Sequence, residues 1–261
     1  MGGVTMGADN QSVQGNDNHI NLYEPHVWKH HTKVAGLEWK NPVGTASGTF
    51  QYSAVRWFYD VSQLGAVCTK GASPVPWEGN PSPRTAESPA ANINAVGLQN
   101  PGVDHYLAED LPKLKAAGAF VISNVAGHCD DDYAEVVEKL ADSDVDMLEI
   151  NVSCPNVSAG GMSVGADPVA LANLMDRLRP LTDKPMIVKL TPNVTDITVP
   201  ARAAVEHGAD ALSMINTLKG MRIHTPNGQP QIAKPTRPAT VKKTVTSPNP
   251  TVQTKMARNG F

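Results

Sequence analysis

Residues 145–155 read VDMLEINVSCP, and this stretch determines the fold that we expect for the chain. It begins with a nearly continuous apolar run, 145–150, of the kind found in a parallel strand buried on both faces. The run ends at Asn151, Ser153 and Cys154, so polar groups follow at the carboxyl end of the predicted strand. Small residues come next and predict a mobile loop. We interpret Cys154 as a reactive thiol on that loop; an inert buried thiol is the alternative.

The same pattern, an apolar run that ends in a polar residue, recurs along the chain. These runs end at Lys70, Asn124, Lys189 and Asn216. Strands that alternate with helices predict a parallel sheet, and several strand ends that carry Lys or Asn indicate one shared site at the carboxyl face of a barrel. We therefore expect an α/β fold of the TIM (β/α)8 type. About six of its eight βα units are readable, so the barrel is expected to be C-terminally incomplete.

The expected elements between these strand ends follow from apolar spacing and from capping residues. Asp167 and Pro168 open a helix in which Leu171, Leu174, Met175 and Leu178 form one apolar face. The other expected elements are a first strand over 43–46, helices over 54–64, 103–117 and 131–140, a helix from Thr195 or Asp196 to Gly208, and a sixth strand over 211–215.

Composition divides the chain into three parts. The 261 residues are 41% hydrophobic, which suits one large domain. Residues 1–32 are polar and rich in Gly and Asn, and we expect a disordered leader. Residues 33–228 carry the barrel pattern. Residues 229–261 contain six Lys or Arg, no Asp or Glu and recurrent Pro, and they show neither a buried strand nor an amphipathic helix. We expect a disordered basic tail there.

Several classes of protein are excluded by what the sequence lacks. The three cysteines have no metal-ligand spacing and leave an odd thiol, which argues against a metal site and a disulfide framework. We assign His26, His30 and His31 to the polar leader, with a metal site as the alternative. No apolar stretch approaches the roughly 20 residues that span a bilayer, and the N-terminus lacks a signal core. We expect a cytoplasmic protein with no metal, no nucleic-acid partner and no membrane attachment.

Residues 71–101 form a segment crowded with Pro, Gly and Asn between two of the predicted units. The segment is too long for a simple βα loop, so we expect it to fold over the barrel mouth. Within it, residues 94–102 read NAVGLQNPG and offer amide side chains and backbone groups that suit a small planar polar ligand. The alternative, that these amides only satisfy the backbone of turns, stays open.

Eight short segments, taken together and in order, resemble dihydroorotate dehydrogenase. They are ASGTF from Ala46, TKG from Thr69, GNPSPR from Gly79, NAVGLQNPG from Asn94, NVAG from Asn124, NVSCPNV from Asn151, VKLTPNVTDI from Val188 and INT from Ile215. The resemblance covers about residues 33–228. TKG and GLQNPG favour the cytosolic NAD-linked branch (class 1B) over the fumarate-linked branch. In the NAD-linked branch, a catalytic subunit with FMN works with a second subunit that carries FAD and an iron–sulfur cluster.

The resemblance implies flavin-dependent oxidation of (S)-dihydroorotate to orotate in de novo pyrimidine (UMP) biosynthesis. It assigns to FMN Ser47, Lys70, Gly71, Asn124, Asn151, Lys189 and Ile215. It assigns to the substrate Lys70, Asn94, Ala95, Val96, Gly97, Leu98, Asn151, Asn216 and Thr217. Cys154 would be the base that removes a proton from C5 while hydride leaves C6 for the flavin N5. The implied assembly is a homodimer core in a heterotetramer with the electron-transfer subunit, which passes electrons to NAD.

The end of the chain departs from the family pattern. The family continues after the sixth strand with a Gly-rich segment and two strands whose loops bind the FMN phosphate, and residues 229–261 show no such pattern. We therefore expect this 261-residue chain to bind FMN poorly by itself. Two alternatives stay open: a flavin domain like that of dihydropyrimidine dehydrogenase, suggested by VKLTPNVTDI and the cysteine loop, and a truncated non-catalytic remnant unable to hold FMN. Asn156 and GLQNPG favour dihydroorotate dehydrogenase over the first.

Overall fold

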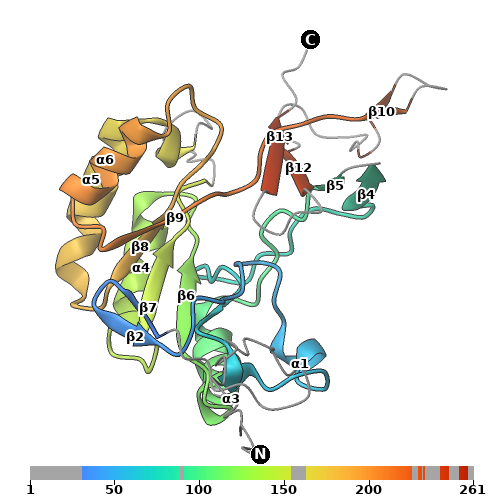
Figure 1. The fold of residues 1–261 in the computed structure, drawn as a ribbon. Coiled ribbons are helices and arrows are strands. Elements are labelled where there is room, and N and C mark those ends of the chain that lie inside the picture. The colour runs from blue at the N-terminus through green and yellow to red at the C-terminus, as the bar shows by residue number, and fades with distance from the viewer. Residues whose placement is uncertain are drawn as a thin grey trace, which may run out of the picture.

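The centre of the molecule is a parallel sheet of five strands with the order β3-β6-β7-β8-β9 (Figure 1). The computed structural model describes residues 31–88, 91–153, 163–224, 229–230, 232, 242–246 and 253–257. The strands of the parallel sheet are β3 (Val67–Cys68), β6 (Val121–Val125), β7 (Met147–Ile150), β8 (Met186–Lys189) and β9 (Ala211–Ser213). Every residue of β6, β7 and β8 is buried, as the apolar runs predict. The sheet and its helices form an incomplete α/β barrel, which confirms the expected fold class.

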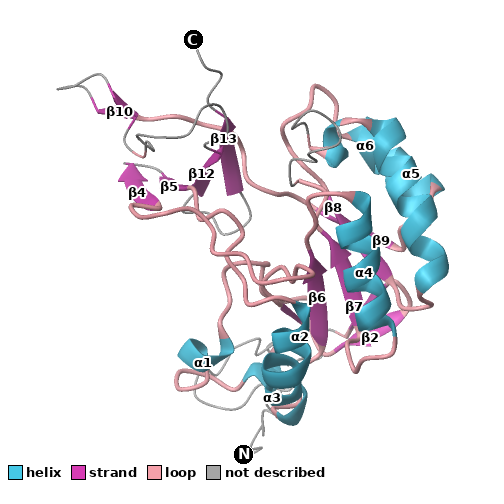
Figure 2. Ribbon diagram, turned by 180° about the vertical axis from the view of Figure 1, so that it is seen from behind, coloured by secondary structure: helices cyan, strands magenta, loops and turns pink. Residues whose placement is uncertain are grey.

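Three helices cover one side of this sheet in Figures 1 and 2: α4 (Asp130–Ala141), α5 (Pro168–Leu178) and α6 (Thr198–Glu206). The side chain of Asp167 accepts hydrogen bonds from the backbone N–H groups of Val169 and Ala170, so the predicted cap of α5 is confirmed. The four apolar residues predicted to face the core from α5 are all completely buried. A further helical segment beside β6 consists of α2 (Val103–His105), the π-helical turn η2 (Tyr106–Asp110) and α3 (Leu111–Ala116).

The expected helix over 54–64 is wrong. The structure has a short α1 (Tyr52–Val55) and a 3-10 turn η1 (Val61–Gln63), separated by turns. Asp60 begins η1 by accepting a hydrogen bond from the backbone N–H of Ser62 at 2.9 Å. Trp57 and Phe58 are 77% and 83% exposed, so no apolar face holds the segment against the core as one continuous helix. Two further 3-10 turns are η3 (Val164–Ala166) and η4 (Arg179–Leu181).

The expected strand over 43–46 is reduced to a single parallel bridge between Gly44 and Ala66. The Asn41 side chain replaces a longer ladder, because its Nδ2 donates to the carbonyl oxygen of Gln63 at 2.7 Å and its Oδ1 accepts from the N–H of Val43 at 3.0 Å. Before it lies an antiparallel hairpin of β1 (Thr32–Val34) and β2 (Leu37–Trp39). This hairpin packs on the inner face of the parallel sheet, where it meets Ile122, Met147 and Ile187.

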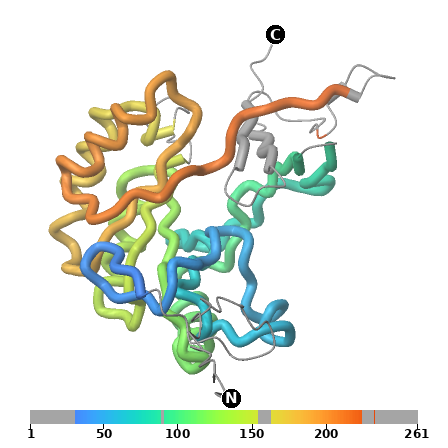
Figure 3. The backbone as a smooth tube through the Cα atoms, viewed as in Figure 1, coloured from blue at the N-terminus to red at the C-terminus, as the bar shows by residue number. Residues whose placement is uncertain are grey.

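A second sheet stands apart from the parallel sheet in Figures 1 and 2 and has the order β13-β12-β5-β4. Its strands are β4 (Thr85–Ser88), β5 (Ala91–Asn94), β12 (Lys242–Thr246) and β13 (Gln253–Ala257). Figure 3 shows the chain crossing from β9 toward this sheet and the short pair β10 (Ile223–His224) and β11 (Gln229–Pro230).

The tail thus contains strands that its composition does not predict. Thr244, Val245 and Thr246 are β-branched, and their backbone pairs with residues 92–94 along the open edge of β5. The division into leader, barrel and tail stays a prediction.

Candidate active site at the carboxyl edge of the parallel sheet

The period of two along each strand determines which side chains share the inner face of the parallel sheet. Ile122, Met147 and Ile187 form an apolar layer there against the β1–β2 hairpin. Two residues further along the same strands come Asn124, Glu149 and Lys189, which therefore point to the same face at the next level. These three side chains form the polar layer. All are buried, with exposed fractions of 0%, 5% and 5%. The polar layer therefore lies directly above the apolar layer, which we call the apolar floor.

The carboxylate of Glu149 holds the polar layer together. Its Oε1 accepts a hydrogen bond from Asn124 Nδ2 at 2.7 Å and lies 3.6 Å from Lys189 Nζ. The Cys68 thiol, at the end of β3, donates to the same oxygen at 3.4 Å. Glu149 was not among the residues expected at the site. Its place in VDMLEIN, two residues before Asn151, was the available signal, because alternation puts both on one face.

Cys68 lies level with Ile122, one level below the polar layer, and is a neutral hydrogen-bond donor to it. Burial, and secondly the Glu149 carboxylate, raise the pKa of the Cys68 thiol well above its usual value, while Lys189 opposes the shift. The backbone of Cys68 is tied to the turn before it, since its N–H donates to Thr45 Oγ1 at 2.9 Å and its carbonyl accepts from the same hydroxyl at 3.2 Å. Its high pKa excludes Cys68 as a thiolate base near neutral pH.

Asn124 presents an oxygen that nothing in the described protein binds. Its Oδ1 is buried and has no hydrogen-bond partner among the described residues. The amide cannot be turned over without cost, because Nδ2 supplies the donor that the Glu149 carboxylate requires. Gly71 lies directly against this oxygen, and a Cβ at position 71 would stand 2.7 Å from Oδ1. A buried acceptor without a donor, beside a glycine, suits a ligand that supplies an N–H.

A second group of polar residues forms the rim above the polar layer. Asn216 Nδ2 donates to Asn151 Oδ1 at 2.7 Å, and Asn216 Oδ1 accepts from the N–H of Thr217 at 2.7 Å. The carbonyl of Asn151 accepts from the Tyr133 hydroxyl of α4 at 2.7 Å. Asn151, Asn216 and Thr217 are at most 6% exposed. The structure therefore brings these three expected residues together, from the ends of β7 and β9.

Ser47, Lys70 and Ile215 are half-buried at the same end of the sheet. Lys70 follows β3 and reaches the turn at 47–48, since a Cβ on Gly48 would lie 3.7 Å from Lys70 Nζ. That glycine has φ of +82°, a conformation that other residues rarely adopt. The first expected segment, ASGTF, and the second, TKG, thus meet beside β3.

The remaining expected substrate residues, 94–98, lie at the second sheet. Ala95 is tied to its neighbours by its N–H, which donates to the Arg84 carbonyl at 2.7 Å, and by its own carbonyl, which accepts from Asn80 Nδ2 at 2.8 Å. Nearby, Asn100 is buried, and its Oδ1 accepts from the N–H of Ser73, the Ser73 hydroxyl and the N–H of Gly102. The Asn100 side chain thus binds the backbone of a turn, which is the alternative to a ligand-binding role left open for the amides of 94–102. The role of residues 94–98 stays a prediction.

The expected base, Cys154, lies outside the described residues, as does the rest of the loop through residue 162. His26 and His30 also lie outside them. Within the described ranges, no group of three or more His, Cys, Asp or Glu side chains is placed to hold a metal ion. No helix in the described part of the chain is both long and apolar enough to cross a membrane.

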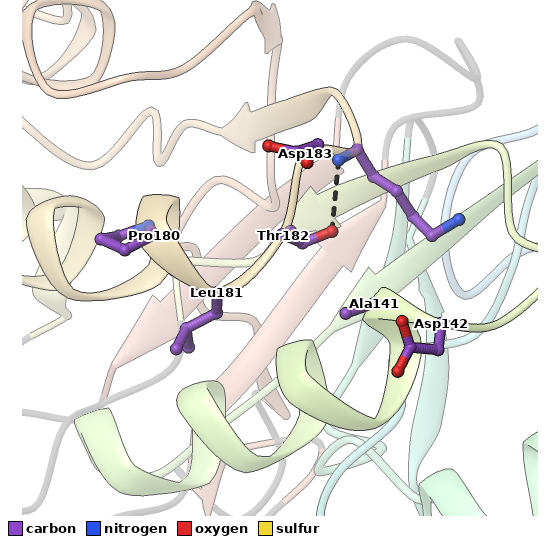
Figure 4. Close-up of a pocket in the computed structure, with 7 residues that line it drawn as sticks. Ala141, Asp142, Pro180, Leu181, Thr182 and Asp183 are labelled. Atoms are coloured by element: carbon purple, nitrogen blue, oxygen red, sulfur yellow. Dashed lines mark hydrogen bonds between the residues drawn. The ribbon is translucent and has the colours of Figure 1, made fainter.

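A surface pocket lies away from the polar layer, between the end of α4 and η4 (Figure 4). It is lined by Ala141, Asp142, Pro180, Leu181, Thr182, Asp183 and Lys184. The backbone N–H of Lys184 donates to Thr182 Oγ1 at 3.2 Å inside it. Because β8 begins at Met186, the pocket belongs to the amino end of the sheet, opposite the end where barrel enzymes place their chemistry. It contains none of the expected site residues.

The fold and the polar layer are those of an α/β-barrel enzyme, in which the polar site lies at the carboxyl ends of the strands. The chain belongs to the dihydroorotate dehydrogenase family, whose model matches residues 29–237, and this is a family of oxidoreductases.

Relatives named for the NAD-linked enzyme are similar to the chain over most of its length. The catalytic subunit named "Dihydroorotate dehydrogenase B (NAD(+))" from Alkaliphilus metalliredigens is 51% identical over 77% of this chain and 67% of its own length. That from Lachnoclostridium phytofermentans is 53% identical over 73% and 64%, respectively. A relative from Aquifex aeolicus, provisionally named for the fumarate-linked A type, is 48% identical over 78% and 67%. The chain thus matches about two thirds of the length of these relatives, and the resemblance found from the motifs is confirmed.

Proposed function

We propose that this chain carries the site for flavin-dependent oxidation of (S)-dihydroorotate to orotate. The observation that carries the proposal is the meeting of residues from four strand ends at one buried edge: Asn124, Asn151, Lys189 and Asn216. The resemblance assigns each of them individually to FMN or to the substrate. Their gathering within a family of dihydroorotate dehydrogenases supports the assignment.

The residues around the polar layer suit a flavin ring. The unsatisfied Oδ1 of Asn124 offers an acceptor to a ring N–H, and the glycine at position 71 keeps a side chain away from this oxygen. Lys189 offers a cation, which favours negative charge on a reduced ring. When bound, FMN would supply the acceptor for the hydride that leaves C6 of dihydroorotate. Ser47, Lys70, Asn151 and Ile215 complete the proposed FMN set.

The rim residues are proposed to hold the substrate. Asn151, Asn216 and Thr217 form a hydrogen-bonded group whose amide and hydroxyl groups suit the polar edge of a pyrimidine, and Lys70 supplies a cation for its carboxylate. Cys154 is proposed to take the C5 proton. In the sequence, Cys154 follows the rim residue Asn151 by three positions, which supports this role. Residues 94–98 are proposed to cover the substrate from the opposite side.

The proposed partner is an electron-transfer subunit with FAD and an iron–sulfur cluster, which passes electrons to NAD. Support comes from the relatives, whose names describe a catalytic subunit of an NAD(+)-linked enzyme. A homodimer core within a heterotetramer is the proposed assembly.

The test is to titrate the purified chain with FMN, remove oxygen and follow the flavin absorbance after adding dihydroorotate. FMN is expected to bind weakly, so it is added in excess; we then expect bleaching of the bound flavin with dihydroorotate and a much slower reaction in Cys154→Ser that still binds FMN. Serine is a far weaker base than cysteine because its hydroxyl ionises less readily.

Three outcomes would contradict the proposal. Wild-type rates in Cys154→Ser would remove the base assignment. Reduction by dihydrouracil in place of dihydroorotate would favour the dihydropyrimidine dehydrogenase-like alternative. A folded chain that binds no FMN at any concentration would favour the non-catalytic remnant.

A further inference from the structure

Glu149 is a buried acid in the middle of the site, with no role in the reaction proposed above. Its side chain is 6% exposed, and it lies between the apolar floor and the rim. Donors from three other positions converge on one of its oxygens: Asn124 from β6, Lys189 from β8 and Cys68 from β3. A carboxylate from the central strand of the sheet therefore contacts side chains from both of its neighbours and from the edge strand.

Burying these charged and polar groups destabilises the folded state unless each of them has a partner. A buried carboxylate or ammonium loses its hydration, and only close partners offset that loss. Lys189 is 5% exposed, and among the described residues its charge partner is Glu149. Without this carboxylate, the ammonium of Lys189 would be drawn toward solvent, and Asn124 would lose the bond that decides which end of its amide faces Gly71.

The geometry points to Glu149 as a positioning residue, which holds Lys189 and the Asn124 amide oriented toward the ring of the flavin and offsets part of the lysine charge there. The inference rests on the proposed flavin site. It adds that the charge acting on the flavin ring is that of a carboxylate–ammonium pair and not that of a lone cation. A partly neutralised lysine stabilises a reduced, negatively charged ring less than an unpaired lysine would.

Glu149→Gln tests this role because it keeps the shape and the oxygen acceptor for Asn124 but removes the negative charge. We expect the reduction potential of bound FMN to become more positive, since a negative charge near the reduced ring is lost. We also expect FMN to bind about tenfold more weakly, in line with the loss of an outer partner that orients a ligand-binding side chain. A purely structural role would lower the melting temperature and leave the potential of the bound flavin unchanged.

The chain offers a matched control three residues away. Asp146, just before β7, pairs with Lys115 at 2.7 Å and accepts from the N–H of Val121 at 2.6 Å, at the opposite end of the sheet. Asp146→Asn removes the same charge from the same region of sequence. We expect it to leave both the FMN affinity and the potential unchanged. Equal shifts of the potential in the Asp146 and Glu149 variants would overturn the inference.

A double-mutant cycle on the flavin-free chain separates this inference from the proposed function. Glu149→Gln alone leaves the buried Lys189 ammonium without its charge partner, so the melting temperature of the variant should fall. Glu149→Gln with Lys189→Met removes both charges and should recover much of this loss. This double variant also serves if the single variant fails to fold. Additive effects of the two substitutions would overturn the pairing, whatever FMN does.

The two failures are distinguishable. Strong coupling between positions 149 and 189 in a chain that binds no FMN would remove the proposed function and with it the flavin role of Glu149. A chain that binds FMN and is reduced by dihydroorotate, but whose flavin potential is unchanged by Glu149→Gln, would retain the function and overturn the positioning role.

Discussion

Residues 103–190 and residues 41–102 are held in place by different means, although both carry motifs of the same family. In the first region, called the packed half, β6, β7 and β8 are buried throughout, and α4 and α5 cover them. In the second, called the turn-rich segment, short elements alternate with turns, and amide side chains such as Asn41 and Asn100 bind the backbone. Strand alternation therefore positions the polar layer, whereas individual hydrogen bonds position the loop that leads to residues 94–98.

This difference has a consequence for stability and for function. The packed half supplies the buried apolar area that holds the sheet, and with it Asn124, Glu149 and Lys189. The turn-rich segment supplies Lys70 and Gly71, together with turns that side-chain hydrogen bonds such as those of Asn100 hold. Substitutions in the packed half should therefore change global stability, and substitutions in the turn-rich segment should change local order.

The largest effect is expected from Leu174→Ala in the packed half. Leu174 is completely buried on α5, and truncation of such a leucine leaves a cavity that costs about 2 to 5 kcal/mol of unfolding free energy. Leu64→Ala is the matched substitution in the turn-rich segment, where the leucine is only half-buried and should matter less. Urea unfolding of both variants measures the difference. Equal losses would show that the two regions are packed alike.

A pH-dependent effect is expected from Tyr106, which packs on β6 through its hydroxyl, 2.5 Å from Ser123 Oγ. Burial raises the pKa of Tyr106 from 10 to about 12, with the hydrogen bond to Ser123 opposing the shift. A pKa raised on folding means that the associated stability is complete below pH 10 and is lost as the pH rises toward 12. The loss is at most about 2 to 3 kcal/mol.

Tyr106→Phe should remove this part of the pH dependence. Above pH 10, the free energy of unfolding should therefore fall more steeply with pH in the wild type than in the variant, as measured by denaturation at a series of pH values. Tyr106→Phe combined with Ser123→Ala controls for the hydroxyl left without its partner. Parallel curves up to pH 12 would contradict the buried environment of the phenol.

In the turn-rich segment, Asn100→Ala should cost about 1 to 3 kcal/mol, because it leaves the buried backbone N–H groups of Ser73 and Gly102 without an acceptor. The loss should appear locally, as faster protease cleavage within 71–102. Asn100→Asp retains the accepting oxygen and loses only the bond from Nδ2 to the Leu98 carbonyl, so cleavage should rise less. If the aspartate variant is cleaved as fast as the alanine variant, the accepted bonds do not hold the loop.

The smallest effect is expected from Trp57→Ser and Phe58→Ser. Both rings are largely exposed in the turn between α1 and η1, and surface changes of this kind usually stay within about 0.5 kcal/mol. Thermal melts of the two variants provide the measurement. A destabilisation of several kcal/mol would mean that these rings are covered in solution, which would erase the contrast with the packed half.

Elements with a local sequence pattern could be predicted without the structure. The apolar runs that end at Asn124, Asn151 and Lys189 are buried strands, because residues buried on both faces leave a continuous apolar record. The start of α5 was equally readable from Asp167 and Pro168, since a cap involves only neighbouring residues. Family motifs suggested most of the candidate site residues, and three of them, Asn151, Asn216 and Thr217, lie together in the structure.

The contacts between strands could not be predicted from local sequence patterns. One carboxylate oxygen of Glu149 is contacted by side chains from both neighbouring strands and from β3. Its spacing from Asn151 predicts the face on which it lies but not these partners. The expected helix over 54–64 failed for the related reason that helical spacing forms a helix only where a core accepts its apolar face. The alternation along a strand determines the face of the sheet on which a side chain lies. Its partners on that face come from other strands, which lie far away in the sequence and are brought together only by folding.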